Sequence, residues 1–440
     1  MWSTPRLASS YALAAGLDIY PPIDQGNQLC WLYGPVFPLW LLPFTLIPRL
    51  AWAFASAQLF HGATLTAALV WAFRPISVDW RQAARRGALT ALLLVSTTIF
   101  GGWLLRLHVD TPALVFLLVS LGCAERYRQT GRRHLLHGSA LAAVVAIWSK
   151  QLAIAYPVML SIYWLHEDKR GQVLEWLRFL LGYGILSALA FIGCFGLKNP
   201  WFYLVDIHAK LPWITLGEYF GQWGHNIGYD LLPWVAMAAL PWLVTRRKGA
   251  RSGPSQPARL SLLWWLGLSQ LPLGLLAAMK FGGGLNSAYA AVFLAMAIVA
   301  GLEGASSTPR WRWGLAIVFC SLALANNLGQ LGQLTPSSHQ DDILALARRH
   351  RNQLYLPWNP LITILTDHKV YPFEYGLFAR QLSGTPVSEA SIRAALPANP
   401  VILYDRTACV REISRYLPEA KPVTEAMLRQ QDAGRERADH

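Results

Sequence analysis

Long apolar stretches alternate with short polar loops from about residue 51 to residue 331. A stretch of about 20 apolar residues spans the ~30 Å hydrocarbon core, so the pattern predicts about ten membrane passes. Several stretches are shorter, and a short helix ends inside the membrane only where protein or a water-filled cavity covers its ends. The short pair around Lys150 therefore predicts a cavity. The stretches fall near 51–73, 87–107, 111–124, 137–149, 152–165, 176–197, 231–245, 260–279, 284–303 and 313–331.

Two further segments do not fit simple spanning helices. Residues 34–48 contain four prolines, and proline at that density breaks a helix, so we expect a re-entrant or interfacial segment. Residues 198–230 are rich in aromatic side chains and predict a long outer loop with amphipathic helices on the membrane surface. Together with an outer loop in residues 1–50, these segments complete a predicted transmembrane domain over residues 1–331.

The composition changes at about residue 331, where polar residues of mixed charge replace the apolar stretches. Helical spacing in 341–350, 388–396 and 410–417 and short β-rich runs in 353–358 and 400–406 predict a small soluble α/β domain. Ser337 and Ser338 can cap the first of these helices. The fold class is therefore mainly α: a polytopic helical bundle with a soluble α/β domain over residues 332–440.

The basic residues occupy alternate loops. Short loops rich in lysine and arginine stay in the cytoplasm, so this set predicts the cytoplasmic face and places residues 332–440 on the outer, periplasmic side of an inner membrane. The set comprises Arg74, Arg81, Arg85, Arg86, Arg126, Arg128, Arg132, Arg133, Lys169, Arg170, Arg246, Arg247, Lys248, Arg251, Arg310 and Arg312.

The opposite loops contain single charges within apolar sequence, and such groups at membrane depth indicate function. They are His108, Asp110, Lys150, Asp206 to Lys210, Glu218 and Lys280. The outer face is therefore the predicted working face.

Composition agrees with a membrane protein, since 54% of the residues are hydrophobic and only 14% are charged. The 20 tryptophans suit two interfacial belts. The net charge of +14 does not indicate nucleic acid, because the positive-inside loops already account for it. The five cysteines have neither metal-site nor disulfide spacing, and we predict no metal ligands. A requirement for a divalent metal cannot be read from the sequence.

The first 34 residues are too polar to span a membrane, yet the loop charges place them outside. An outer N-terminal segment normally needs a preceding helix to carry it across. Either this short segment crosses the membrane unaided, or a further transmembrane helix precedes Met1 in the gene product, and we favour the second alternative.

Four segments together resemble the GT-C superfamily of integral-membrane glycosyltransferases, which includes the protein O-mannosyltransferases and the lipid A aminoarabinose transferase. ALAAGLDIYPP with LYGPVFPLWLLPF is similar to the first outer loop of that superfamily. The other three are RLHVDTPALVFLLVSL, ALAAVVAIWSKQLAIAYP and KFGGGLNSAYAAVFLA, at 106–121, 140–157 and 280–295. Their order and common outer side carry the resemblance over residues 8–303.

The resemblance implies transfer of a sugar from a polyprenyl-phosphate donor to a lipid, glycan or protein acceptor, among membrane lipids. A carboxylate takes the acceptor's proton, and cations stabilise the departing lipid phosphate. By the resemblance, the candidate catalytic residues are Asp18 and Asp110, with Asp24 as an alternative to Asp18. The candidate phosphate-binding residues are Lys150, Lys280, Arg106 and His108, and the candidate pocket residues are Tyr33, Gln151 and Asn286.

Other interpretations of these residues stay open. Lys150 and Lys280 can be anchors that extend to the interface. Asp110, before Thr-Pro, can be only a helix cap, and Asp18 can be a turn residue. A transporter or flippase would suit the bundle if it showed repeated Gly- or Pro-broken helices, and a non-catalytic envelope assembly protein needs no catalytic acid. An assay of sugar transfer separates these alternatives.

Overall fold

The computed structural model describes residues 3–95, 107–226, 257–281, 289–304, 339–404, 413–416 and 423–424. Most of them are helical, which confirms the mainly α fold class. Within these ranges two segments are long and apolar enough to cross a membrane, Leu50–Ile76 and Arg170–Phe195. The predicted stretches 231–245 and 313–331 lie outside the described residues, so the number of passes stays a prediction.

The chain divides into two compact units. Unit 1 combines Met1–Ala57, Phe191–Pro212 and Pro336–His440, and unit 2 combines Gln58–Ala190 and Trp213–Thr335. The polar C-terminal segment thus belongs to the same compact unit as the first residues of the chain. The boundary that we predicted between residues 331 and 332 stays a prediction.

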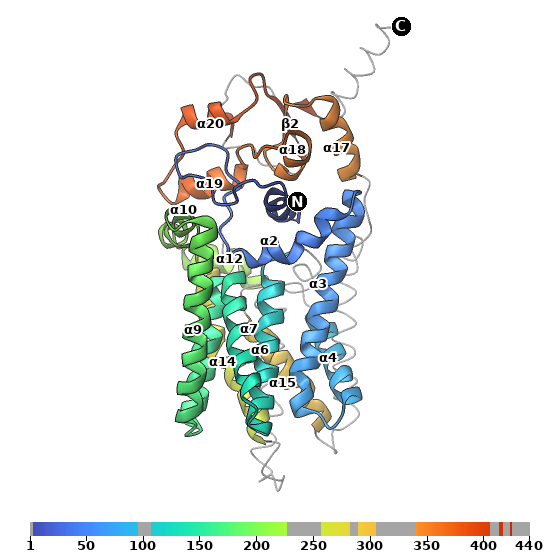
Figure 1. Cartoon of the computed structure of the whole chain (residues 1–440), viewed down its shortest axis with the longest axis vertical. Coiled ribbons are helices and arrows are strands. Elements are labelled where there is room, and N and C mark those ends of the chain that lie inside the picture. The colour runs from blue at the N-terminus through green and yellow to red at the C-terminus, as the bar shows by residue number, and fades with distance from the viewer. Residues whose placement is uncertain are drawn as a thin grey trace. The chain divides into compact units, whose positions relative to one another are not determined.

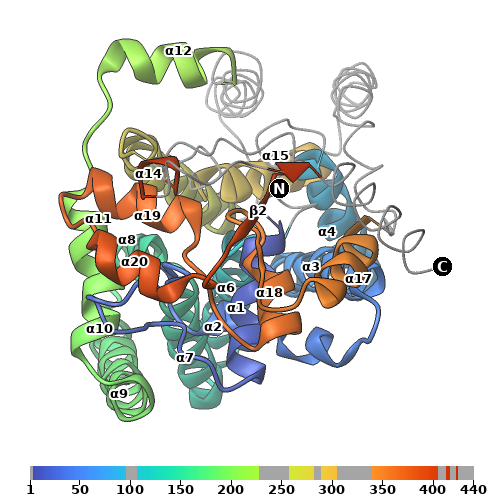
Figure 2. The same cartoon turned by 90° about the horizontal axis from the view of Figure 1, so that it is seen from above.

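Unit 2 is a helical bundle whose long helices run side by side (Figure 1). Helix α6 packs against α7, α14 against α15 and α8, and α15 against α4; the view from above in Figure 2 shows the same neighbours. These helices are α4 (Trp80–Val95), α6 (Asp110–Thr130), α7 (Arg133–Ser149), α8 (Ala155–His166), α14 (Pro257–Ala278) and α15 (Ala290–Gly304). They join the unit-2 parts of α3 (Leu50–Phe73) and α9 (Arg170–Phe195).

Helices α6 and α7 form an antiparallel hairpin. Helix α6 ends where Gly131 adopts a left-handed conformation, with φ 66°, and its N–H donates to Tyr127, the usual glycine end of a helix. Midway along the hairpin, Ser120 Oγ donates to the Ser139 carbonyl over 2.8 Å. This register also brings the start of α6 beside the end of α7.

Helix α6 is longer than the predicted stretch 111–124. The sequence AERYRQT continues the helix through polar residues, which apolar patterning does not detect. Its polar end is fixed by Arg128, whose guanidinium pairs with Glu125 over 2.8 Å and with Glu167 beyond α8 over 3.1 Å. Gln129 donates to the Pro75 carbonyl over 2.7 Å in the turn between α3 and α4. Among the described residues, the arginine-bearing turns after α3, α6 and α8 therefore meet at one end of the bundle.

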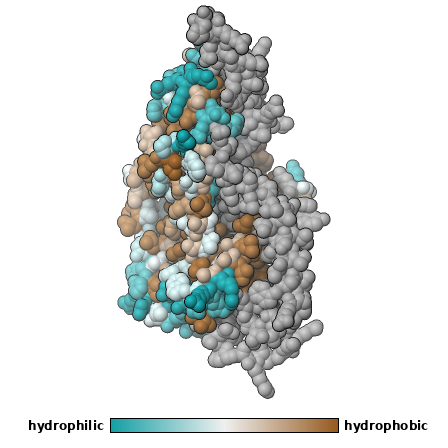
Figure 3. All heavy atoms as spheres, turned by 90° about the vertical axis from the view of Figure 1, so that its right-hand side faces the viewer, coloured by the Kyte–Doolittle hydropathy of each residue, from teal (hydrophilic) through white to brown (hydrophobic). Residues whose placement is uncertain are grey.

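Large apolar side chains remain exposed along the unit-2 helices, among them Leu92 on α4 and Leu181 and Leu189 on α9. Only 6% of the most apolar window of α9 is buried. Figure 3 shows a hydrophobic zone on one face, with hydrophilic side chains gathered below it. Exposed apolar surface of this extent is typical of contact with lipid.

Unit 1 contains short helices around a small sheet. The proline-rich residues 34–48 contain the short helix α2 and the 3₁₀ turn η1, and their re-entrant or interfacial position stays a prediction. The helices are α1 (Ser3–Ala14), α2 (Val36–Leu41), η1 (Leu42–Leu46), α10 (Lys198–Trp201), the π-helix η4 (Phe202–Asp206), α11 (Ile207–Lys210), α17 (His339–Arg349), α18 (Pro360–Asp367), α19 (Glu374–Leu382), α20 (Glu389–Ala395) and α21 (Ile413–Tyr416).

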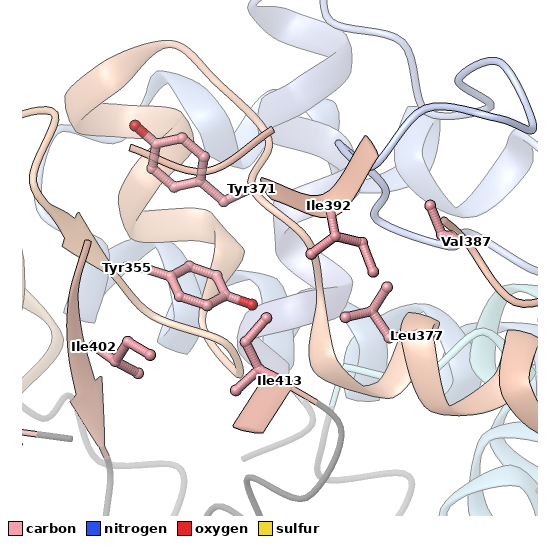
Figure 4. Close-up of a cluster of buried hydrophobic side chains, with 7 residues drawn as sticks. All are labelled: Tyr355, Tyr371, Leu377, Val387, Ile392, Ile402 and Ile413. Carbon is pink, nitrogen blue, oxygen red and sulfur yellow. The ribbon is translucent and has the colours of Figure 1, made fainter. Parts of the chain in front are cut away.

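The sheet orders β1 (Leu354–Tyr355), β2 (Val401–Tyr404) and β3 (Val423–Thr424) in parallel. Strands β1 and β2 lie where the sequence predicted strands, and α17 and α20 where it predicted helices; α21 falls within the third predicted helix. The capping serines 337 and 338 lie outside the described residues. Figure 4 shows the core beside the sheet, formed by Tyr355, Tyr371, Leu377, Val387, Ile392, Ile402 and Ile413.

Candidate functional site

A buried ion pair joins the start of α6 to the end of α7 at the arginine-poor end of the hairpin. Lys150 Nζ donates to Asp110 Oδ1 over 2.6 Å, and the two side chains are 12% and 5% exposed. A charge in such surroundings is costly unless it is paired. The sequence alone suggested a bound phosphate as the partner of Lys150, and the structure supplies Asp110.

Two further side chains hold the Asp110 carboxylate. The phenol of Tyr289, just before α15, donates to Oδ1 over 2.8 Å, and this side chain is buried. His108 Nδ1 contacts Oδ2, and His108 is also buried. Asp110, His108, Lys150 and Tyr289 thus form one polar group, which we call the Asp110 cluster.

Local backbone conformation places both members of the ion pair. Lys150 is extended, with φ −152° and ψ 126°, and it separates α7 from the 3₁₀ turn η3 (Gln151–Ile154) that leads into α8. Its ammonium lies at the C-terminal end of α7 and the Asp110 carboxylate at the N-terminal end of α6. Each charge therefore complements the helix dipole at its own position.

The interpretation of Asp110 as the cap of α6 is wrong. Val109 occupies the N-cap, without a side-chain capping bond, and Asp110 is the first helical residue. Its carboxylate is instead directed to partners on other elements, because Lys150 and Tyr289 both donate to it.

Lys280 follows the end of α14 and contacts Trp213. Its ammonium lies 4.7 Å from the centre of the Trp213 ring, and the two residues form an antiparallel bridge. Next to it, Ile214 N–H donates to the Met279 carbonyl over 2.9 Å. Gln151 follows Lys150 directly and begins η3, where it is half-buried.

Asp18 and Tyr33 belong to unit 1, whereas the members of the Asp110 cluster belong to unit 2. Both Asp18 and Asp24 are exposed, and Tyr33 is half-buried beside Trp31 and His208. Tyr20 OH donates to the Tyr33 carbonyl over 2.5 Å and closes the loop of residues 20–33, which bears Asp24. Arg106 and Asn286 lie outside the described residues. Among the residues described, no group of three or more His, Cys, Asp or Glu side chains is placed to hold a metal ion.

Tyr289 is the member of the cluster that the sequence did not single out. It stands in the segment KFGGGLNSAYAAVFLA, from which only Lys280 and Asn286 were chosen. A usable signal existed: it is a tyrosine near the start of an apolar stretch, and a buried tyrosine usually needs a hydrogen-bond partner.

No protein-family profile matches the sequence, and neither does any curated protein. Among solved structures, the chain is similar to the crystal structure of ArnT from Cupriavidus metallidurans bound to undecaprenyl phosphate. The TM-score is 0.55 at 15% sequence identity, over 96% of this chain and 80% of the ArnT chain. At this identity the likeness concerns the fold alone, and the protein therefore has a helical fold similar to that of ArnT.

Proposed function

We propose that the protein is a membrane glycosyltransferase that moves a sugar from a polyprenyl-phosphate donor to an acceptor at the outer face of the inner membrane. The observation that carries the proposal is the buried Asp110 cluster at the arginine-poor end of the bundle. Support comes from the likeness to ArnT, which was crystallised with undecaprenyl phosphate, a lipid of the same chemical class as the proposed donor's carrier.

The reaction is a single displacement at the anomeric carbon. The acceptor hydroxyl or amine forms a new bond to that carbon, the bond from the carbon to the phosphate oxygen breaks, and a carboxylate takes the acceptor's proton. The departing lipid phosphate carries the growing negative charge, and cations in a low-dielectric site stabilise that charge. We assign this role to Lys150, with His108, Arg106 and Lys280 as further candidate phosphate ligands.

The two candidate carboxylates have different surroundings. Donors on Lys150 and Tyr289 already engage Asp110, so we assign it to orient the lysine ammonium. Asp18 is exposed, so an acceptor can reach its carboxylate and transfer a proton to it. We therefore assign Asp18 as the candidate base. Tyr33, Gln151 and Asn286 are the candidate pocket residues, and residues 332–440 form a candidate outer domain.

The test is transfer of a labelled sugar from its polyprenyl phosphate to envelope extract, by membranes that contain the chain. Lys150→Ala should abolish transfer and Lys150→Arg should keep part of it, because arginine retains the charge with a different geometry. Lys198→Ala is the matched control, since Lys198 is exposed. Equal rates for Lys150→Ala and the wild type would refute the proposed role, and movement of the donor across the membrane without transfer would favour a flippase.

A further inference from the structure

The loop of residues 17–35, which we call the N-terminal loop, lies against elements from much later in the chain. His208 Nε2 on α11 donates to the Leu32 carbonyl over 3.0 Å. Phe373 N–H, just before α19, donates to the Gln28 carbonyl over 3.1 Å. All of these residues belong to unit 1. The conformation of the N-terminal loop therefore depends on donors from α11 and from the residue before α19.

Arg380 of α19 makes the most constrained of these contacts. It is only 3% exposed. Its Nη1 donates to the Ile23 carbonyl over 2.6 Å and its Nε to the Thr385 carbonyl over 2.8 Å. The guanidinium also lies 5.0 Å from the centre of the Phe202 ring in η4. One planar cation thus joins the N-terminal loop, η4 and the end of α19, which a lysine cannot do because it lacks the fork of donors.

Gly376 of α19 allows the loop to approach closely. A Cβ at Gly376 would lie 2.5 Å from the Cβ of Cys30, well inside contact distance. Cys30 is buried and has φ 49°, a left-handed conformation that is strained for residues with a Cβ. Burial raises the pKa of its thiol to about 12, so the thiol is neutral in this contact. The space between the N-terminal loop and α19 therefore holds the Cys30 side chain but has no room for a second side chain at position 376.

The loop makes a second approach of the same kind. Gly26 lies against the backbone of α20, and a Cβ there would fall within contact distance of the Ser391 carbonyl. Glycine on each side of the interface, at Gly26 and Gly376, allows backbone to pack against backbone without a side chain between them.

We propose that α19 is a positioning element, in which Gly376 and Arg380 hold the N-terminal loop in the conformation that sugar transfer requires. The proposal rests on the function proposed above, because its catalytic part depends on Asp18 and Tyr33 in this loop. It assigns the C-terminal segment a direct part in forming the site. Gly376 and Arg380 act through the loop and are positioning residues.

The experiment uses compensating substitutions with two separate readouts. Hydrogen–deuterium exchange of the 17–35 peptide in the detergent-solubilised full chain reports loop order, with the α6–α7 hairpin as internal reference. Steady-state transfer reports kcat and KM. Gly376→Ala should speed exchange in the loop only, and kcat should fall roughly 10- to 100-fold because reacting groups are misplaced.

Cys30 supplies the matched controls. Gly376→Ala with Cys30→Gly removes the opposing Cβ and should restore slow exchange and most of kcat. Gly376→Ala with Cys30→Ala keeps that Cβ and should restore neither. Gly62→Ala is a control for the added methyl group, since nothing lies within 4 Å of a Cβ at Gly62. Arg380→Lys, which keeps the charge, should give an intermediate rise in exchange.

Each result decides one part of the proposal. Unchanged loop exchange in both Gly376→Ala and Arg380→Lys would overturn the positioning role. Faster loop exchange with unchanged kcat would overturn its link to transfer. A wild-type chain without transfer activity would refute the proposed function instead, while rescue of slow exchange by Cys30→Gly would still establish that α19 orders the loop.

Discussion

The Asp110 carboxylate lies among partners that its own helix does not supply. Lys150 comes from the break after α7 and Tyr289 from the start of α15. Three parts of the bundle therefore meet at one charge. Removal of any single partner leaves a buried polar group with fewer bonds, and the free-energy cost of that is greater than the value of the bond itself.

The first prediction concerns the balance of charge in this pair. Lys150→Met should lower the free energy of unfolding by about 3–5 kcal/mol, because it leaves the Asp110 charge buried without its cation. Combining it with Asp110→Asn should recover most of that stability, since neither residue is then charged, yet transfer should stay lost. Thermal unfolding in detergent measures the first effect, and a double variant no more stable than Lys150→Met would contradict the expectation.

The second prediction isolates the phenol. Tyr289→Phe removes one donor to Asp110 and keeps the ring, which should cost about 1.5–3 kcal/mol of stability, as expected for a bond to a charged group. The transfer rate should also fall, because the carboxylate that orients Lys150 is less restrained. Tyr183→Phe on α9 is the control for loss of a tyrosine hydroxyl bond away from the cluster. Equal stability of Tyr289→Phe and the wild type would mean that the bond contributes nothing.

At the scale of single residues, the sequence predicted which charged residues are candidates for the site, but it did not predict which of them pair. Asp110 and Lys150 stand out because charges are rare in apolar sequence. Their pairing depends on the register of the α6–α7 hairpin, which rests on contacts such as that between Ser120 and Ser139. Patterning along a single chain contains no information on that register.

The helices of unit 2 approach one another through glycine. A Cβ at Gly87 of α4 would lie 2.6 Å from Val70 Cγ2, and one at Gly122 of α6 would lie 2.5 Å from Trp71 Cδ1. Both contacts fall on α3. The Arg126 guanidinium lies 4.7 Å from the centre of the Trp71 ring. Small residues commonly allow such close contacts between membrane helices.

The third prediction follows at the scale of these helices. Gly87→Ala and Gly122→Ala should each lower the unfolding temperature of the solubilised protein, although alanine favours a helix by up to about 1 kcal/mol over glycine. Gly182→Ala on α9 provides the comparison, because nothing lies within 4 Å of a Cβ there, and it should leave the unfolding temperature unchanged or raise it. A rise for all three would show that helix propensity outweighs packing.

Helices with a continuous apolar pattern were placed well, as with α3, predicted at 51–73 and observed at Leu50–Phe73. Ends were placed poorly where a helix continues in polar residues, as α6 does to Thr130. Lys150 was expected at a turn between two helices, and its extended backbone lies there. The break itself was readable because a polar pair, Lys150 and Gln151, interrupts the apolar sequence.

The arrangement of charge over the whole chain gives the fourth prediction. The arginine-bearing turns that the structure describes in unit 2 share one end of the bundle, where Arg128 pairs with Glu167, and that end should face the cytoplasm. Reporter fusions at about residues 128 and 250 should therefore report the cytoplasm, and fusions at about 215 and 400 the outer compartment. A cytoplasmic signal at 400 would overturn both the pass count and the location of the C-terminal segment.

At the scale of the whole molecule, the sequence did not predict which segments make up unit 1. The change in composition predicted a separate domain over residues 332–440, because polar residues replace apolar ones there. It did not predict that the C-terminal segment forms one compact unit with Met1–Ala57 and Phe191–Pro212. Contacts such as that of Arg380 with Ile23 depend on backbone carbonyls, which every residue has and which therefore leave no trace in the sequence.

The discontinuity of unit 1 also has a consequence for biosynthesis. Its first segment ends at Ala57, and its last begins at Pro336, about 280 residues later. At roughly 5–20 residues per second, the ribosome needs about 15–60 s to make the intervening chain. The newly made first segment must wait through that interval without α19, open to proteases and chaperones. A nascent chain arrested before residue 336 should accordingly be cleaved near its start much faster than the finished protein.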